Sequence, residues 1–297
     1  MHKILILTPL ADNLHPVPTP VLALPDHRVM TLEGPDAVAF AHAQFANDVL
    51  ALDAGHWHWN AWLTPKGRVI ALFALARLDE DRLLAVLPDY PADVFASQLQ
   101  RYVFRRKLKV SARQDLHVNG ALDLSPHANG SRLGIEGDGV TFDLQAGDTP
   151  RFWRVEPRQA PQSEAFVAQW RALDLRHGVP RLPESQWEQW TPQQIALDRL
   201  NAYSIKKGCY PGQEIVARTH FLGKAKRSLR LLQTPQPVEV GAPVQADGVA
   251  PGTIVSTAET GDGSLALAVV ALDATAEHWT SGAISLAETP LLPAPAR

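Results

Sequence analysis

The sequence predicts an α+β protein that ends in an all-β region. Residues 56–88 read as three strands separated by turns at residues 65–67 and 79–81, the pattern of an antiparallel meander. Runs with helical periodicity lie on both sides of this meander, at residues 34–50 and 91–104. After residue 225, short strand-like runs alternate with Gly and Pro, which predicts a small barrel or sandwich.

The first part of the chain supplies the other strands. Residues 28–34 are expected to form a strand, and Pro35 suits the first turn of the helix that follows. A basic strand is expected at residues 106–113. Short strands with Gly-Asp turns are expected at residues 115–155.

Two helical runs precede the all-β region. The first covers residues 163–178, with Ser163 as its N-cap and Gly178 as its stop. The second covers residues 193–205. The proline-rich start of the chain, residues 1–25, is expected to be irregular, and residues 291–297 are expected to be a frayed end.

Composition limits the classes of protein to which the chain can belong. Its 297 residues are 45% hydrophobic and 20% charged, with a net charge of −3, as in an ordinary globular protein of about two domains. The apolar run near the start is too short for a signal peptide, and no stretch approaches the roughly 20 apolar residues of a membrane span. We therefore expect a cytoplasmic protein that does not enter a membrane.

The chain contains one cysteine, Cys209, within the stretch KKGCYPGQE at residues 206–214. A single thiol excludes an intrachain disulfide and any metal or iron–sulfur site built from several thiolates of this chain alone. Pro211 suits a first helical turn, so the thiol should lie near a helix N-terminus beside Lys206 and Lys207, which favours the thiolate. The alternative, an inert cysteine that acts as a small hydrophobe, remains open.

Half of the chain's 28 lysines and arginines lie in two short segments, residues 199–230 and 101–113. Such clustering suits a polyanionic ligand or partner, although solvated bases paired with acids elsewhere are an equal alternative. The first segment contains Arg199, Lys206, Lys207, Arg218, Lys224, Lys226, Arg227 and Arg230, and the second contains Arg101, Arg105, Arg106, Lys107, Lys109 and Arg113.

Aromatic residues and histidines give weaker signals. Tryptophans could stack on a flat heterocycle, but core packing is their commoner role. His56 and His58 would share one face of a strand, yet two histidines without a third ligand do not define a metal site, and no metal is predicted. The chain also lacks GxSxG, P-loop, HExxH and GxGxxG signatures. The tryptophans considered are Trp57, Trp59, Trp62, Trp170 and Trp190.

Residues 206–229 closely resemble the signature of the YgfZ family, the folate-binding relatives of the glycine-cleavage T-protein. The signature K-G-C-Y-x-G-Q-E followed by A-R is matched by Lys207, Gly208, Cys209, Tyr210, Gly212, Gln213, Glu214, Ala217 and Arg218. Shorter stretches look like other family segments at Gln44, Asn47 and Asp48, at Lys66 and Gly67, at Tyr102, Phe104 and Arg105, and in the helix at 170–180.

The resemblance implies a T-protein-like architecture. Residues 1–225 would form two interleaved antiparallel-sheet and helix subdomains around a central folate cavity, with boundaries near residues 50, 112 and 160. Residues 226–297 would form a small C-terminal β-barrel.

The resemblance also implies a function. The chain would be a folate-binding accessory protein for iron–sulfur cluster assembly or repair, indirectly supporting tRNA modification, with Cys209 as the functional thiol. Tetrahydrofolate or a derivative would be the ligand, and iron–sulfur assembly proteins or client enzymes would be the partners. The folate-contact candidates are His27, Gln44, Asp48, Lys66, Tyr102, Arg105, Trp170, Arg176, Lys207, Tyr210, Gln213, Glu214 and Arg218.

Two departures from the T-protein pattern bear on activity. Where T-proteins carry an acidic pair after the K-G turn, this chain has Val69, Ile70, Ala71 and Leu72, so enzymatic activity stays undecided. Arg176 replaces a glutamate that contacts the pterin in T-proteins. A tetrahydrofolate-dependent aminomethyltransferase is one alternative, and a direct tRNA-binding factor is another, less favoured one.

Overall fold

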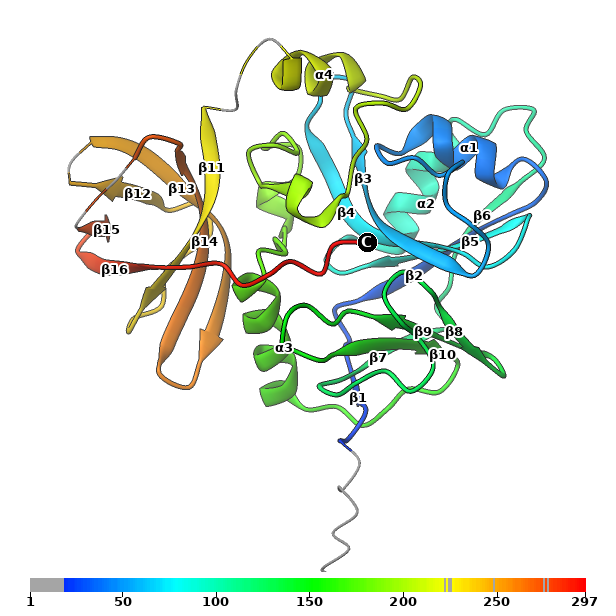
Figure 1. Ribbon diagram of the computed structural model, residues 1–297, viewed down its shortest axis with the longest axis horizontal. Coiled ribbons are helices and arrows are strands. Elements are labelled where there is room, and N and C mark those ends of the chain that lie inside the picture. Colours follow the sequence, from blue (N-terminus) through cyan, green and yellow to red (C-terminus); the bar gives the residue numbers. More distant parts are fainter. Residues whose placement is uncertain (1–18, 222, 224–225, 248, 275, 277) are drawn as a thin grey trace, which may run out of the picture.

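The computed structural model describes residues 19–221, 223, 226–247, 249–274, 276 and 278–297 (Figure 1). Most of the proline-rich start therefore lies outside the described residues, as does Lys224. The architecture consists of two five-stranded antiparallel sheets and a closed barrel.

The first sheet contains the predicted meander. Its strand order is β3-β4-β5-β2-β6, and helices α1 and α2 pack on one face, where Phe40 and Phe95 share a core with Phe73 of β4. Alternate residues of β4 face the opposite side, as expected for a strand buried on both faces. The elements are β2 (Arg28–Glu33), α1 (Ala37–Gln44), β3 (His56–Leu63), β4 (Val69–Arg77), β5 (Arg82–Leu87), α2 (Ala92–Gln100) and β6 (Lys109–Ala112).

The second sheet has the order β1-β7-β10-β9-β8. Strand β1 pairs with β7 before the chain enters the first sheet, so the two sheets are interleaved in sequence. The other faces of both sheets share one core, in which Trp57 and Trp59 of β3 meet Phe142 of β9 and Trp153 of β10. The strands are β1 (Leu22–Ala23), β7 (His117–Ala121), β8 (Gly134–Glu136), β9 (Gly139–Asp143) and β10 (Phe152–Glu156).

Helix α3 (Glu164–Arg176) begins as predicted, because the Ser163 side chain accepts a hydrogen bond from the Phe166 amide at 3.3 Å. It packs between the second sheet and the barrel (Figure 1), in contact with strands β13 and β14. Trp170 lies on its buried face.

The all-β region closes into a six-stranded barrel around a core of its own. The predicted α+β class with a C-terminal barrel is confirmed. The barrel strands, in their order around it, are β11 (Arg227–Thr234), β14 (Gly263–Ala271), β13 (Val249–Thr260), β12 (Pro243–Ala246), β15 (Trp279–Ser281) and β16 (Ile284–Thr289).

The helix predicted at residues 193–205 is wrong. The chain there makes only a short 3-10 turn, η2 (Leu197–Leu200), because Ala196 and Asn201 have left-handed backbones with φ of 52° and 55°. An earlier 3-10 turn, η1 (Glu184–Gln186), and helix α4 (Gln213–Phe221) complete this connection.

The frayed end predicted for residues 291–297 is also wrong. These residues leave the barrel and return to the centre of the molecule, as the red trace in Figure 1 shows. The Leu292 amide donates to the Arg176 carbonyl at 2.8 Å, and the Trp59 indole Nε1 donates to the Pro295 carbonyl at the same distance. The apolar side chain of Leu291 packs against the shared core.

Candidate functional site

Lys207 ties the cysteine motif to the first sheet. Its Nζ donates to the carbonyls of Phe45 at 2.6 Å and Asn47 at 3.2 Å, and also to that of His42. These carbonyls lie at the C-terminal end of α1 and just beyond it, where a cation is favoured. The ammonium also lies 4.8 Å from the centre of the Tyr210 ring. Burial lowers the pKa of Lys207 to about 8, although the charge of Asp48 opposes the shift.

Gly212 fixes the turn that follows the cysteine. Its φ is 81°, and a Cβ at this position would lie 2.5 Å from the Thr64 carbonyl oxygen. Only glycine tolerates both the left-handed backbone and this close approach. The turn therefore packs against the Lys66-Gly67 turn. Gln213 then donates from Nε2 to the Lys207 carbonyl at 3.1 Å, which holds the two ends of the motif together.

Cys209 is exposed on this held loop. Helix α4 begins at Gln213, so Tyr210–Gly212 lie between the thiol and the helix. Lys206 is exposed, whereas the Lys207 ammonium is bonded to the three carbonyls near α1. The geometry presents a single thiol to solvent on a loop whose flanking residues are anchored.

The two histidines considered for metal binding lie in different environments. His58 is buried, with Nε2 3.2 Å from Asn60 Nδ2, and burial lowers its pKa to about 4 despite the charge of Asp48. His56 Nδ1 lies 3.2 Å from the Ala54 carbonyl. Within the described ranges, no three His, Cys, Asp or Glu side chains are grouped to hold a metal ion.

A second cluster of candidate residues lies at the centre, between the two sheets and α3. Trp59 and Trp153 contact edge to face with ring centroids 5.7 Å apart, and His27 contacts Trp153 at 5.2 Å. Trp170 is completely buried, and the Arg151 guanidinium lies 5.2 Å from its ring. We call these five residues the central cluster.

Buried nitrogens of the central cluster lack partners in the part of the chain that the structure describes. Such groups are costly to bury, so each calls for a ligand or an ordered water. Indole and guanidinium nitrogens are donors only, so the missing partner must present acceptors. The atoms are Nε1 of Trp153 and Trp170, Nε and Nη2 of Arg151, and Nε2 of His27, together with Nε2 of nearby His177.

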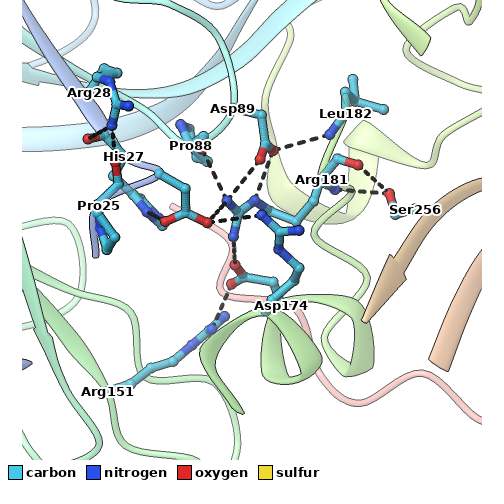
Figure 2. A network of polar contacts seen from close by, with 12 residues as sticks. Pro25, His27, Arg28, Pro88, Asp89, Arg151, Asp174, Arg181, Leu182 and Ser256 are labelled. Carbon is cyan, nitrogen blue, oxygen red and sulfur yellow. Dashed lines mark hydrogen bonds and ion pairs between the residues drawn. The ribbon is translucent and has the colours of Figure 1, made fainter. Parts of the chain in front are cut away.

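An ionic network borders the central cluster and centres on Arg181 (Figure 2). Its guanidinium donates to Asp26 at 2.7 Å, to Asp89 at 2.8 Å and to Asp174 at 3.1 Å. Burial opposes ionisation of Asp26, but its contacts with His27 and Arg181 hold its pKa well below the usual range. Asp174 also accepts from Arg151 Nη1 at 2.6 Å, which joins the network to the central cluster.

The folate-contact candidates do not form one site. His27 and Trp170 belong to the central cluster, and Arg176 is the half-buried last residue of α3. Lys66 and Tyr102 line a separate cavity of about 640 Å³, and exposed Arg105 follows Tyr102 closely in the chain. The candidates around the cysteine motif and α1 are Gln44, Asp48, Lys207, Tyr210, Gln213, Glu214 and Arg218.

Sequence reasoning missed Arg151, Trp153, Asp174, His177 and Arg181. One signal was available for Asp174, which lies four residues after Trp170 and so shares its helix face. A carboxylate on a buried face requires a cation. Arg151 directly precedes strand β10 and Arg181 lies in the loop after α3. No local sequence pattern links either of them to Asp174 of α3.

The chain was compared with known proteins. No family model matches it. It is 26% identical over 286 residues to a tRNA-modifying protein YgfZ of Klebsiella pneumoniae, covering 86% of this chain and 85% of that protein. A protein of the same name from Cronobacter sakazakii is 28% identical over 280 residues, with the same coverage. An uncharacterized protein of Haemophilus influenzae is 25% identical over 257 residues, covering 84% of this chain and 88% of that protein.

A solved structure shares the fold. The glycine cleavage system aminomethyltransferase T of Bartonella henselae superimposes with a TM-score of 0.74 at 17% identity, covering 94% of this chain and 87% of that one. The resemblance to the YgfZ family and the T-protein-like fold are therefore confirmed. None of the helices in the described ranges has the length and apolar content to cross a membrane.

Proposed function

We propose that this protein binds tetrahydrofolate or a derivative at the central cluster and serves iron–sulfur cluster assembly or repair in the cytoplasm, indirectly supporting tRNA modification. The observation that carries the folate half is the set of buried, unpartnered donors around Trp153, Trp170 and Arg151. They lie at the centre of a T-protein-like fold, between two sheets and a helix. The similarity to proteins named YgfZ supports the same proposal.

The central cluster fits the chemistry of a folate. A pterin ring offers a carbonyl oxygen and ring nitrogens as acceptors, which would match the indole and guanidinium donors. Its flat face would suit the tryptophans. Arg176, half-buried at the end of α3, would suit the carboxylates of the folate's glutamate.

The residues present favour an accessory role over aminomethyl transfer. Val69–Leu72, where T-proteins carry an acidic pair, are all buried apolar residues of β4. General acid–base catalysis needs a titratable group within reach of the substrate, and this stretch supplies none. If the protein is instead a transferase, the purified chain should convert a folate adduct without any partner.

Exposed Cys209 is the proposed functional thiol. One thiolate cannot hold a cluster, so cluster or sulfur chemistry would be shared with an iron–sulfur assembly protein or client enzyme. The anchored loop would present the thiol in a defined position. In a deletion strain, Cys209→Ser should fail to restore iron–sulfur enzyme activity. Full restoration by this variant would refute the proposed role.

Folate binding is tested by removing single indole N–H groups. Trp170→Phe and Trp153→Phe each retain an aromatic ring but lose one unpartnered donor. Each should weaken tetrahydrofolate binding about tenfold, the effect of one hydrogen bond of about 1.4 kcal/mol. Isothermal titration calorimetry measures the affinity.

Trp279→Phe is the matched control, because the Trp279 indole nitrogen is also buried and without a partner in the described ranges, but lies in the barrel core. Its affinity should equal that of the wild type. Absence of binding in every protein, or an equal loss in all three variants, would contradict a folate site at the central cluster.

A second candidate function, direct RNA binding, is favoured by the second basic segment. Phe104 is 90% exposed with a left-handed φ of 48°, and Tyr102 is 49% exposed. In the described ranges, Arg101, Arg105, Arg106 and Lys107 form no ion pair. Exposed aromatics among unpaired cations suit unpaired bases and phosphates. In the first segment, by contrast, Lys207 is buried and Arg230 pairs with Glu288.

This candidate predicts salt-dependent binding of an RNA hairpin with an unpaired loop. Arg105→Ala should weaken binding and reduce the salt slope by about one. Phe104→Ala should weaken binding with little change in slope. Arg132→Ala, another exposed arginine, is the control. Absence of binding at low salt would exclude the candidate.

A further inference from the structure

Residues 291–297 lie against the central cluster and are held there mainly through main-chain carbonyls. His177 Nδ1 donates to the Pro293 carbonyl at 2.6 Å, and Arg199 Nη2 donates to that of Leu292 at 2.6 Å. Trp59 Nε1 donates to the Pro295 carbonyl at 2.8 Å. The segment thus supplies carbonyl acceptors to donors of the centre, as the proposed ligand would.

Arg297 anchors the far end of this segment. Its Nη2 donates to the carbonyl of Asp143, the last residue of β9, at 2.8 Å and to that of Gln145 at 2.9 Å. The guanidinium also lies 5.6 Å from the ring of Trp57, which contacts Trp59. The segment therefore runs from the end of α3 to the second sheet and contacts Trp57 and Trp59 on the way.

The hold on the segment is limited to a few points. It belongs to no strand, and Pro293 and Pro295 have no N–H groups, so it cannot pair as a strand at those positions. Pro293 is exposed whereas Pro295 is buried, and the apolar side chains beyond Leu292 are only alanine and proline. Such a segment can leave without disrupting either sheet, because no strand pairs with it and its hydrogen bonds run to side chains of the centre or from Leu292 and Arg297 of the segment itself.

The segment binds donors that lie beside those proposed for the ligand. His177 uses Nδ1 for Pro293, while its Nε2 is one of the buried nitrogens without a partner. Trp59 packs on Trp153, whose indole nitrogen is also buried without a partner in the described ranges. A cavity of about 400 Å³ is lined by His27 and one of about 530 Å³ by residues of α3, but Trp170 lines neither of them. Entry of a folate at Trp170 therefore requires space that the described conformation does not provide.

We infer that residues 291–297 form a displaceable gate over the central cluster, which closes the site by covering it and by holding the Trp59 and His177 donors beside those left for the folate. This inference rests on the proposed function, because it concerns access to the same site. Binding of a folate releases the segment, and release exposes it to solvent. The apparent affinity is then the intrinsic affinity reduced by the fraction of molecules in which the gate is open.

Hydrogen exchange tests the gate on the full chain. The Leu292 amide is protected by its bond to the Arg176 carbonyl. Saturating tetrahydrofolate should accelerate its exchange, by an order of magnitude or more, because the segment is released. Unchanged or slower exchange at Leu292, with folate bound, would overturn the inference while leaving the proposed folate site intact.

Two variants test the competition by calorimetry with tetrahydrofolate. Removal of residues 291–297 should raise affinity roughly tenfold or more, and Arg297→Ala should raise it by a smaller factor. Arg297→Ala keeps the apolar contacts of the segment, so it remains informative if the deletion fails to fold. Arg158→Ala, an exposed arginine elsewhere, should leave affinity unchanged.

The two proposals fail in distinguishable ways. Binding of equal affinity in wild type, deletion and Arg297→Ala would overturn the gate and retain the folate site. Absence of binding in all of them would overturn the folate site and with it the gate. Binding by the open variants alone would support both.

Discussion

Arg151 and Arg181 are two buried arginines that share one carboxylate, Asp174, yet their surroundings differ. All three guanidinium nitrogens of Arg181 have protein acceptors, from Asp26, Asp89, Asp174 and a carbonyl. Arg151 has one paired nitrogen, and the other two are buried without a partner in the described ranges. A buried charge that is fully hydrogen-bonded stabilises a unique fold, whereas a partly bonded one keeps donors for a ligand. We therefore assign Arg181 to architecture and propose Arg151 as a residue of the folate site.

The network around Arg181 also explains how the parts of the chain hold together. Asp26 precedes the first sheet, and Figure 2 shows the other two carboxylates, Asp89 after β5 and Asp174 of α3. The main chain of Arg181 exchanges two hydrogen bonds with the Ser256 hydroxyl of the barrel, at 3.0 and 2.6 Å. Arg181 thus connects segments that flank the sheets, helix α3 and the barrel.

The largest effect is expected from Arg181→Met. It removes the cation that pairs with Asp89 and one of the cations around Asp26 and Asp174, so we expect a loss of about 3–5 kcal/mol in the free energy of unfolding, measured with urea. Arg82→Met is the control, because Arg82 pairs with Asp79 at the surface and should cost no more than about 1 kcal/mol. A loss below about 1 kcal/mol for Arg181→Met would remove the architectural half of the comparison.

A smaller effect of a different kind is expected from Arg151→Met. Asp174 keeps Arg181 as its partner, so the loss of stability should be smaller than for Arg181→Met. Affinity for tetrahydrofolate should fall about 10- to 100-fold, the effect of losing charge-assisted hydrogen bonds of about 1.5–3 kcal/mol. Calorimetry together with urea unfolding measures both quantities. Full affinity combined with severe destabilisation would reverse the roles given to the two arginines.

The smallest effect is expected on the pH dependence of stability and comes from His58, a buried side chain that is neutral at pH 7. The folded-state pKa of His58, about 4, lies below the ordinary value of 6.5, so the unfolded chain binds more protons between these values. Stability should therefore fall as pH decreases from 7 toward 4, with a contribution from His58 of about 1 kcal/mol between pH 7 and 5.5. Urea unfolding at both pH values measures it, and His58→Gln should reduce the difference. An unchanged difference in that variant would assign the pH effect to other groups.

The sequence alone determined the elements with strong local patterns. Strand-like runs separated by turns indicate the meander, Ser163 indicates the start of a helix, and Gly and Pro separate the strands of the barrel. Each of these patterns is local, so it identifies its element within a few residues. The cysteine motif was likewise readable as a signature, and in this structure its glycine and lysine make contacts that depend on those residue types. Gly212 meets the Thr64 carbonyl, and Lys207 caps α1.

Only the tertiary structure decided the rest. The helical pattern at residues 193–205 yielded to left-handed backbones at Ala196 and Asn201, where packing overrides propensity. The proline-rich end of the chain has no periodicity, yet donors of Trp59, His177 and Arg199 hold it at the centre. Arg151 precedes strand β10, Asp174 lies in helix α3 and Arg181 lies in a loop, yet the three side chains form one network. Contacts between residues far apart in sequence depend on how the sheets are placed, and local patterns carry no record of that placement.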